Sequence, residues 1–171
     1  MSVIAQAGAK GRQLHKFGGS SLADVKCYLR VAGIMTEYSQ PGDMMVVSAA
    51  GSTTNQLISW LKLSQTDRLS AHQVQQSLRR YQMDLISGLL SPDAADTLIA
   101  IFIQDLERLA GLLDGSITDA VYAEVVGHGE VWSARLMAAV LNHLGVEAAW
   151  LDARSFLRAE RSAQPHMVKV G

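Results

Sequence analysis

The segment Lys-Phe-Gly-Gly-Ser-Ser at residues 16–21 combines residue types that suit phosphate binding. A glycine pair lets backbone N–H groups approach an anion closely, and a following helix would add its partly positive N-terminus. Lys16 adds a full positive charge, but it precedes the glycines, whereas the lysine of the common phosphate-binding loop follows them. Taken alone, the segment favours a simpler alternative, a glycine turn followed by a serine helix cap.

A second polar segment follows the short apolar run at residues 44–47. The small residues at 48–51 leave room for a ligand at the carboxyl end of a strand, which is the usual binding edge of an open α/β sheet. Thr54 and Asn55 could exchange hydrogen bonds with a ligand there. The alternative is that Thr53 or Thr54 only caps the next helix.

Two further segments carry charged groups. Glycines flank a histidine in Gly-His-Gly-Glu at residues 127–130 and are expected to interrupt a helix. Glu130 would then begin a new helix, where a carboxylate gains from the helix dipole and could receive a ligand's ammonium group. The alternative is a kink with Glu130 as a first-turn acid. Asp152 and Arg154 favour an internal ion pair over a place at the pocket rim.

The elements that must position these segments follow from hydrophobic periodicity. Residues 13–17 predict a short strand, and apolar residues recur at helical spacing from Leu22 to Met35. Residues 44–47 predict a buried strand, and a second helix follows it. The order strand, small-residue loop and helix therefore occurs twice, which predicts parallel strands joined by helical crossovers.

The middle of the chain is helical. Residues 71–90 and 93–114 both have helical periodicity, and Ser91 and Pro92 between them suit an N-cap and a first helical turn. We expect a helical hairpin over about 71–114, inserted between the elements of the sheet.

The last third continues this pattern. Residues 118–126 and 130–144 predict two helices separated by the glycines at 127 and 129, with Gly145 as the stop of the second. Residues 146–151 predict a third strand that ends at Asp152.

Composition limits the class of protein. The chain has 171 residues, 49% apolar and 18% charged, with a net charge of −1, so we expect one globular domain without a nucleic-acid surface. Its single cysteine, Cys27, excludes an internal disulfide and favours a reducing compartment. The apolar run at 98–103 is too short to cross a membrane. Residues 1–12 are expected to form a flexible leader, and the protein is expected to be cytoplasmic.

Taken in order, the four segments closely resemble the aspartate kinase family, over about residues 14–158 and including the hairpin. The chain is most similar to the start of the bifunctional aspartokinase–homoserine dehydrogenases of the methionine-linked kind. The resemblance implies an α/β, amino-acid-kinase-like three-layer sandwich with a mostly parallel sheet. Residues 13–171 would be a partial kinase domain, the amino-acid-binding part, with the carboxyl-terminal half missing.

The resemblance also implies a reaction, in which the γ-phosphoryl group of ATP passes to the side-chain carboxylate of L-aspartate. The product, 4-phospho-L-aspartate, begins lysine, threonine and methionine biosynthesis. ATP is expected with Mg²⁺, without a metal site built by this chain. His128 is expected to have no catalytic part, because phosphoryl transfer to a carboxylate needs no general base. The implied site residues are Lys16 for charge neutralisation, Gly18, Gly19 and Ser20 for the phosphate, Ser48 and Ala49 for the pocket wall, and Thr54 and Glu130 for aspartate.

The resemblance has limits. No Gly-Arg-Gly-Gly-Ser-Asp loop of the family occurs, and the residues after Pro165 do not obviously continue the family pattern. The chain alone is therefore expected to be inactive, with an exposed sheet edge and apolar surface that favour self-association. A full-length relative would form homo-oligomers. The alternatives are another amino-acid kinase, acting on glutamate, acetylglutamate or carbamate, and a non-catalytic fragment that assembles with intact kinase subunits.

Overall fold

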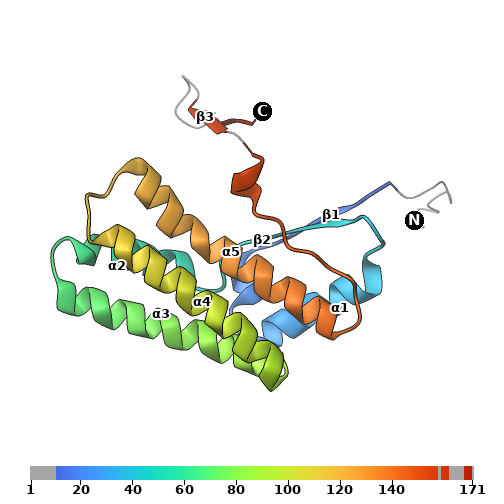
Figure 1. Cartoon of the computed structure of the whole chain (residues 1–171). Coiled ribbons are helices and arrows are strands. Elements are labelled where there is room, and N and C mark those ends of the chain that lie inside the picture. Colours follow the sequence, from blue (N-terminus) through green and yellow to red (C-terminus); the bar gives the residue numbers. More distant parts are fainter. Residues whose placement is uncertain (1–10, 158, 162–167, 171) are drawn as a thin grey trace.

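The computed structural model describes residues 11–157 and the backbone of residues 159–161 and 168–170 (Figure 1). It confirms a mixed α/β fold in which helices dominate. Most of the leader expected at residues 1–12 lies outside the described residues. The elements follow in the order β1 (Leu14–Phe17), η1 (Gly19–Leu22), α1 (Val25–Tyr38), β2 (Met44–Val47), α2 (Thr53–Ser64), α3 (Arg68–Leu89), α4 (Pro92–Leu113), α5 (Asp119–His143), η2 (Ala153–Ser155), β3 (Ala159–Arg161) and β4 (Val168–Val170).

Strands β1 and β2 form a parallel pair, as expected from the repeated order of strand, loop and helix. The register places Leu14 beside Met44 and Phe17 beside Val47. Because side chains alternate along a strand, Phe17, Met45 and Val47 pack on the core while Leu14, Met44 and Val46 stay exposed. The helices thus cover one face of this sheet, and no described residue forms the third layer that the expected sandwich requires. β3 and β4 form a separate antiparallel pair.

Helices α3 and α4 form the hairpin of the middle region and contact each other along their length (Figure 1). α3 begins at Arg68, three residues earlier than the periodicity suggests, because the Asp67 carboxylate caps its first turn. α4 begins at Pro92, with Ser91 at the N-cap position but without a side-chain cap bond. The sequence located both helices, whereas the first residue of α3 depends on the Asp67 cap.

Helix α5 corrects one expectation. Residues 119–143 form a single helix, so Gly127 and Gly129 do not interrupt it and Glu130 does not stand at a helix start. The prediction that a helix dipole stabilises the Glu130 carboxylate is therefore wrong. A glycine costs a helix only about 1 kcal/mol, which tertiary packing easily offsets. α5 has that packing, since it contacts α1, α2, α4 and β2.

The third strand expected at residues 146–151 is also wrong, since this segment pairs with no strand among the described residues. At one residue of the segment, Ala148, a side chain binds the backbone instead. The Asn142 amide donates to the carbonyl of Ala148 at 2.7 Å and its Oδ1 accepts from the Ala148 N–H at 3.2 Å. The Asn142 side chain thus takes both backbone hydrogen bonds of Ala148. Sequence periodicity cannot reveal such a contact.

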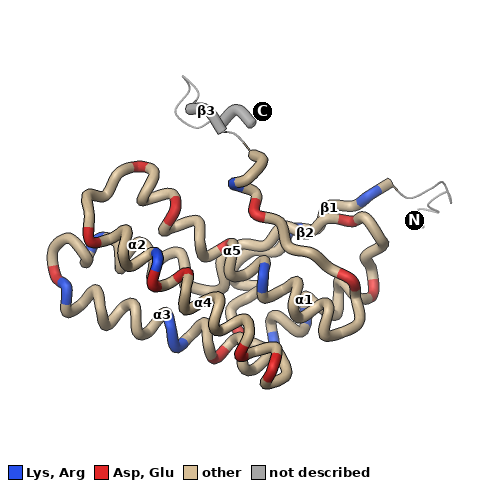
Figure 2. The backbone as a smooth tube through the Cα atoms, viewed as in Figure 1, with Lys and Arg blue, Asp and Glu red and all other residues tan. Residues whose placement is uncertain are grey.

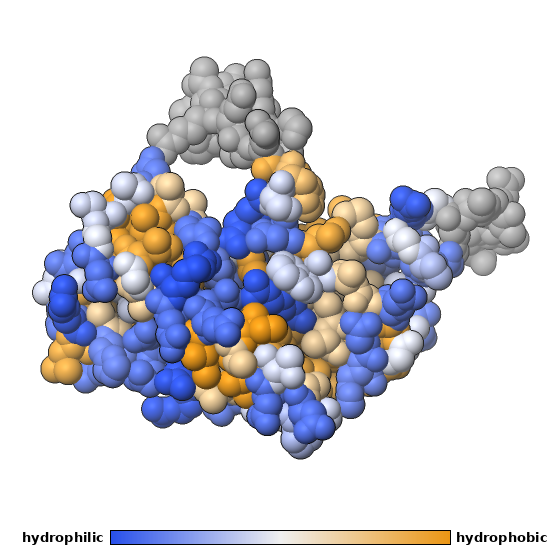
Figure 3. Space-filling model, in the orientation of Figure 1, coloured by the Kyte–Doolittle hydropathy of each residue, from blue (hydrophilic) through white to orange (hydrophobic). Residues whose placement is uncertain are grey.

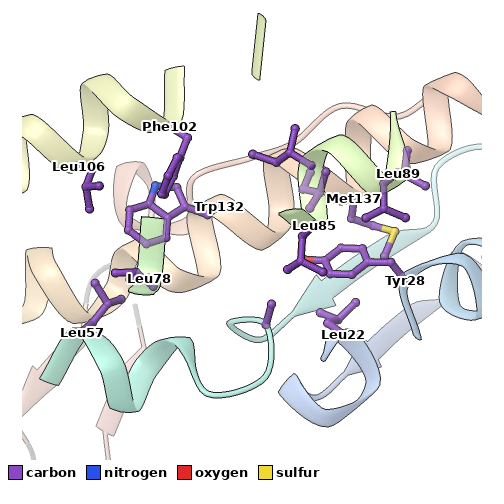
Figure 4. Close-up of a cluster of buried hydrophobic side chains, with 14 of the residues drawn as sticks. Leu22, Tyr28, Leu57, Leu78, Leu85, Leu89, Phe102, Leu106, Trp132 and Met137 are labelled. Carbon is purple, nitrogen blue, oxygen red and sulfur yellow. The ribbon is translucent and has the colours of Figure 1, made fainter. Parts of the chain in front are cut away.

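The core lies between the helices and the covered face of the sheet (Figure 4). Side chains from β1's loop, α1 and all four later long helices meet there, which ties the hairpin to the rest of the molecule. Residues labelled in Figure 4 are Leu22, Tyr28, Leu57, Leu78, Leu85, Leu89, Phe102, Leu106, Trp132 and Met137.

The surface carries charges of both signs, interspersed along the helices (Figure 2). Apolar side chains are exposed in separate patches on the face shown in Figure 3. None of the helices in the described ranges combines the length and hydropathy that a bilayer span requires.

Candidate functional site

The loops after β1 and β2 meet at one edge of the sheet. The Ser48 N–H donates to the carbonyl of Phe17, and the Gly51 N–H donates to the carbonyl of Gly19, both at 3.0 Å. A Cβ at Gly19 would lie 2.6 Å from the carbonyl oxygen of Ala49, so only glycine allows the two loops this approach. The parallel pairing of β1 and β2 therefore brings the first two polar segments together, at the edge where open α/β sheets bind ligands.

The first loop holds the lysine and the glycine pair. A Cβ at Gly18 would lie 3.6 Å from the Lys16 ammonium nitrogen, so the glycine leaves open the space beside that charge. Lys16 is exposed on the uncovered face of β1, and Ser20 is exposed in η1.

The helix expected from Leu22 begins three residues later in the structure. The 3₁₀ turn η1 comes first, and α1 begins only at Val25. The Asp24 carboxylate accepts from the Cys27 N–H at 2.8 Å, and this hydrogen bond lowers the pKa of Asp24. The N-terminus of α1 is thus capped by the chain's own carboxylate instead of being open to a phosphate. The groups of this segment that can still bind an anion are the Lys16 ammonium group, the backbone N–H groups and the serine hydroxyls.

The second loop separates two neighbouring threonines. Thr53 is fully buried, and its hydroxyl accepts from the Gln82 side-chain amide at 2.9 Å. Thr54, in the first turn of α2, is half-buried. The alternative that a threonine caps this helix is wrong, because Ser52 occupies the N-cap position. Thr53 therefore has a structural part, and the hydroxyl of Thr54 is the one placed near the loop surface.

Helix α5 brings a carboxylate to the same loops. A Cβ at Gly129 would lie 2.7 Å from the Ala49 Cβ and 3.2 Å from the Thr53 Cγ2, so the glycine lets α5 touch the β2–α2 loop. One residue later, Glu130 Oε1 accepts from the Ala49 N–H at 3.3 Å. Its other carboxylate oxygen has no such contact among the described residues, and the side chain is exposed.

The structure thus brings together residues that lie far apart in the sequence. Ala49 contributes its backbone N–H, because its side chain is buried against Gly129. Ser48 is half-buried beside it. Of the residues expected at the site, contacts join Gly19, Ala49 and Glu130. The others belong to the segments that these contacts bring together, namely Lys16 in β1, Gly18 after it, Ser20 in η1, Ser48 after β2 and Thr54 in the first turn of α2.

A charged cluster lies beside this site, where α4, α5 and η2 meet. The expected pair of Asp152 and Arg154 is present, at 2.7 Å. The hydrogen bond from Arg154 lowers the pKa of Asp152, and the same bond raises the pKa of Arg154. Sequence reasoning missed that Arg108 and Glu124 join them. The spacing of these residues along the chain carries no signal of that contact, because the contact depends on how α4 lies against α5.

No three acidic, histidine or cysteine side chains converge as metal ligands within the described ranges. Protein ligands for a Mg²⁺ ion are therefore not identified in this part of the chain.

The chain matches known proteins over most of its length. Residues 11–169 match the model of the amino acid kinase family. The chain is 84% identical over 167 residues to the bifunctional aspartokinase/homoserine dehydrogenase 2 of Escherichia coli (strain K12), which covers 98% of this chain but only 21% of that protein. The match reaches residue 169, so the expectation that the residues after Pro165 do not continue the family pattern is wrong.

Two solved structures have the same fold. The E. coli aspartokinase III in complex with lysine and aspartate is similar with a TM-score of 0.78 and 22% identity, over 94% of this chain and 35% of that chain. The same enzyme in complex with aspartate and ADP has a TM-score of 0.77 and 24% identity, over 87% of this chain and 33% of that chain. The chain spans about a third of the aspartokinase III chain and about a fifth of the bifunctional relative. With its fold, its paired loops and its matched residues, this chain belongs to the amino acid kinase family.

Proposed function

We propose that the chain forms the aspartate-binding part of an aspartate kinase domain. That domain would transfer the γ-phosphoryl group of ATP to the side-chain carboxylate of L-aspartate and so make 4-phospho-L-aspartate, for lysine, threonine and methionine biosynthesis. The high identity to a bifunctional aspartokinase supports this substrate over those of other amino-acid kinases. The aspartokinase III structures, which contain aspartate or aspartate and ADP, support the same ligand pair.

The observation that carries the proposal is the hydrogen bond between the Ala49 N–H and Glu130 Oε1. It joins a carboxylate on α5 to the loop that precedes Thr54 and α2, and that loop is itself bonded to the glycine loop. One oxygen of Glu130 is held in this way, and the other can accept from the α-ammonium group of aspartate. The hydroxyls of Thr54 and Ser48 would donate to the carboxylates of the substrate.

The glycine loop suits the phosphate that would be transferred. Lys16 has its ammonium group beside the space that Gly18 leaves open, and a side chain at Gly18 would fill this space. Lys16 would neutralise charge that grows on the phosphoryl oxygens, while Gly18, Gly19 and Ser20 supply backbone and hydroxyl donors. In a complete site, removal of one such stabilising group costs about 3–4 kcal/mol of activation free energy.

The nucleotide supplies the phosphoryl group when it is bound, and Mg²⁺ would accompany its phosphates. Such ions are commonly held by one or two carboxylates together with substrate phosphates. The residues of this chain fit the transferred phosphate, whereas we assign none of them to the adenine or to the metal ion.

Binding of L-aspartate to the purified chain tests the proposal. We expect addition of L-aspartate to shift the amide resonances of Ala49, Thr54 and Glu130 in NMR spectra. Glu130→Gln should weaken this binding about tenfold or more, since a hydrogen bond to a charged group contributes about 1.5–3 kcal/mol. The matched control is Glu37→Gln, an exposed carboxylate on α1, which should leave the affinity unchanged.

The outcomes separate the candidate functions. Absence of any shift at these three residues with millimolar aspartate would contradict the proposal. Stronger binding of L-glutamate would favour another amino-acid kinase. In an assay with ATP, Mg²⁺ and aspartate, the chain alone should show no turnover, and turnover that Lys16→Ala abolishes would disprove the expected inactivity. Cytoplasmic location and assembly of longer relatives into homo-oligomers remain predictions.

A further inference from the structure

A buried histidine lies at the centre of the charged cluster beside the site. His128 is only 1% exposed, on the face of α5 that turns toward α4 and η2. Its ring makes an edge contact with Trp132, with ring centroids 5.9 Å apart. Nothing in the proposed reaction uses this side chain. The surroundings of a buried titratable group favour one of its protonation states, so the contacts of His128 indicate which state its ring adopts.

The hydrogen bonds of His128 fix its tautomer. Arg108 Nη2 lies 2.8 Å from Nε2, and a guanidinium can only donate, so Nε2 must be the unprotonated acceptor. The proton of the neutral ring is then on Nδ1, which donates to the carbonyl of Glu124 at 2.8 Å. Arg154 Nη1, 3.2 Å from Nδ1, therefore makes a close approach to the ring and not a hydrogen bond. Both nitrogens are occupied only if His128 is neutral.

The same cluster fastens the segment after α5. Arg154 donates to both oxygens of Asp152 and to Glu124 Oε2 at 2.9 Å. Its Cδ lies 4.0 Å from the position that a Cβ on Gly127 would occupy, so the arginine stem lies directly against α5. Glu124 Oε1 binds Arg108 of α4 at 2.8 Å. Glu124 therefore links two arginines, and His128 lies between them.

Charges that face His128 come from all three elements of the cluster. Glu124 is on α5 itself, Asp105 and Arg108 are on α4, and the remaining pair is on η2. With a neutral ring, Glu124 and Asp152 offset Arg108 and Arg154, and Asp105 is paired with Arg135. A proton on Nε2 would point at the Arg108 guanidinium and leave one uncompensated positive charge in a buried place.

We propose that neutral His128 closes a pH-sensitive clasp, in which residues 152–155 are held against α4 and α5, and that protonation of Nε2 opens it. Protonation removes the acceptor of Arg108 and adds a third cation between two arginines. The side chains of Arg108 and Arg154 are 49% and 36% exposed, so they can move outward when this happens. The segment that Arg154 anchors would then leave the surface of α5. Burial lowers the pKa of His128, which is the direction that a clasp closed by the neutral ring requires.

NMR of the full chain, with the histidine rings labelled with ¹⁵N, tests the clasp. At pH 8 we expect His128 to be protonated on Nδ1. As the pH falls, His128 should gain its second proton only below the ordinary pKa of a histidine, because burial lowers its pKa. Each unit by which that pKa is lowered is about a tenfold bias toward the closed clasp. Backbone amides of residues 152–155 should shift with the midpoint of His128.

Variants separate the clasp from a general effect of acid. His128→Gln keeps an acceptor for Arg108 but cannot titrate, so amides 152–155 should lose their pH response. His143→Gln should leave that response intact. An Nε2-protonated ring at pH 8, protonation of His128 at or above the ordinary pKa of a histidine, or amides 152–155 that ignore the His128 midpoint would each overturn the proposal. These three readings come from the unmodified chain, so they decide the question even if His128→Gln does not fold.

Discussion

Gly129 and Ala49 touch so closely that a Cβ on the glycine would stand 2.7 Å from the Ala49 Cβ. Ala49 is buried, and the next residue on α5, Glu130, accepts a hydrogen bond from its backbone N–H. The distance between helix and loop at this one point therefore decides whether the carboxylate reaches the loop. Gly129 is therefore needed for this contact between helix and loop, and it does not break the helix.

Gly129→Ala should destabilise the chain by about 1–3 kcal/mol, the usual range for overpacking. The new methyl group would also meet Thr53 Cγ2 at 3.2 Å, and both neighbours are fixed by their own backbones. The higher helix propensity of alanine returns only about 1 kcal/mol. Urea unfolding followed by circular dichroism measures the net change.

Gly33→Ala is the matched control, since Gly33 is an exposed residue inside α1 with nothing within 4 Å of its Cβ position. It should stabilise the chain by about 0.5–1 kcal/mol. If both substitutions stabilise it, the close contact at Gly129 does not exist.

The two threonines at the start of α2 should respond differently to removal of the hydroxyl. Thr53→Val leaves the buried amide of Gln82 without its acceptor and should cost about 1–3 kcal/mol of unfolding free energy. Thr54→Val should leave stability nearly unchanged but weaken aspartate binding. Urea unfolding and an NMR titration with aspartate measure the two effects, and equal losses of stability would contradict this division of roles.

Acid should loosen the start of β1. The Asp43 carboxylate accepts from the N–H of Gln13 at 2.7 Å and of Gln40 at 2.9 Å, and these bonds lower the pKa of Asp43. A group whose pKa is lower in the folded state stabilises the fold above its unfolded pKa of about 3.9. That contribution should be lost as the pH falls through the lower, folded pKa. Unfolding free energies measured between pH 3 and pH 7 should therefore decrease at the acidic end.

Asp43→Asn should reduce both the stability at pH 7 and its dependence on pH below about 4. Asp84→Asn, at an exposed position of α3, is the control that should retain the pH dependence of the unmodified chain. An unchanged acid profile in Asp43→Asn would show that other carboxylates set it.

The uncovered face of the strand pair should promote self-association. Leu14, Met44 and Val46 are 67%, 54% and 47% exposed and share that face. Val46→Lys should therefore lower the sedimentation coefficient at high protein concentration. Leu69→Lys, which removes an even more exposed side chain from α3, should not. A monomer at all concentrations would contradict the expectation.

The local sequence was sufficient for much of the framework. A short apolar run after a turn located β2, the segment before the glycine pair located β1, and the repeated order of strand, loop and helix predicted that they are parallel. Pro92 marked the first turn of α4. These features depend on backbone preferences and on periodicity, which a few neighbouring residues determine. The glycine loop and the segment after β2 could be proposed as one site for the same reason, since parallel strands end at a common edge.

The tertiary structure alone decided the rest. Gly127 and Gly129 stay inside α5 because packing on its other faces outweighs their low helix propensity. Residues 146–151 pair with no strand in the part of the chain that the structure describes, and the Asn142 side chain instead binds the backbone of Ala148. Two features depend on contacts between residues 20 to 29 positions apart: which threonine is buried, and the neutral state of His128 between two arginines. Such contacts arise only when whole helices pack, so no short stretch of sequence contains them.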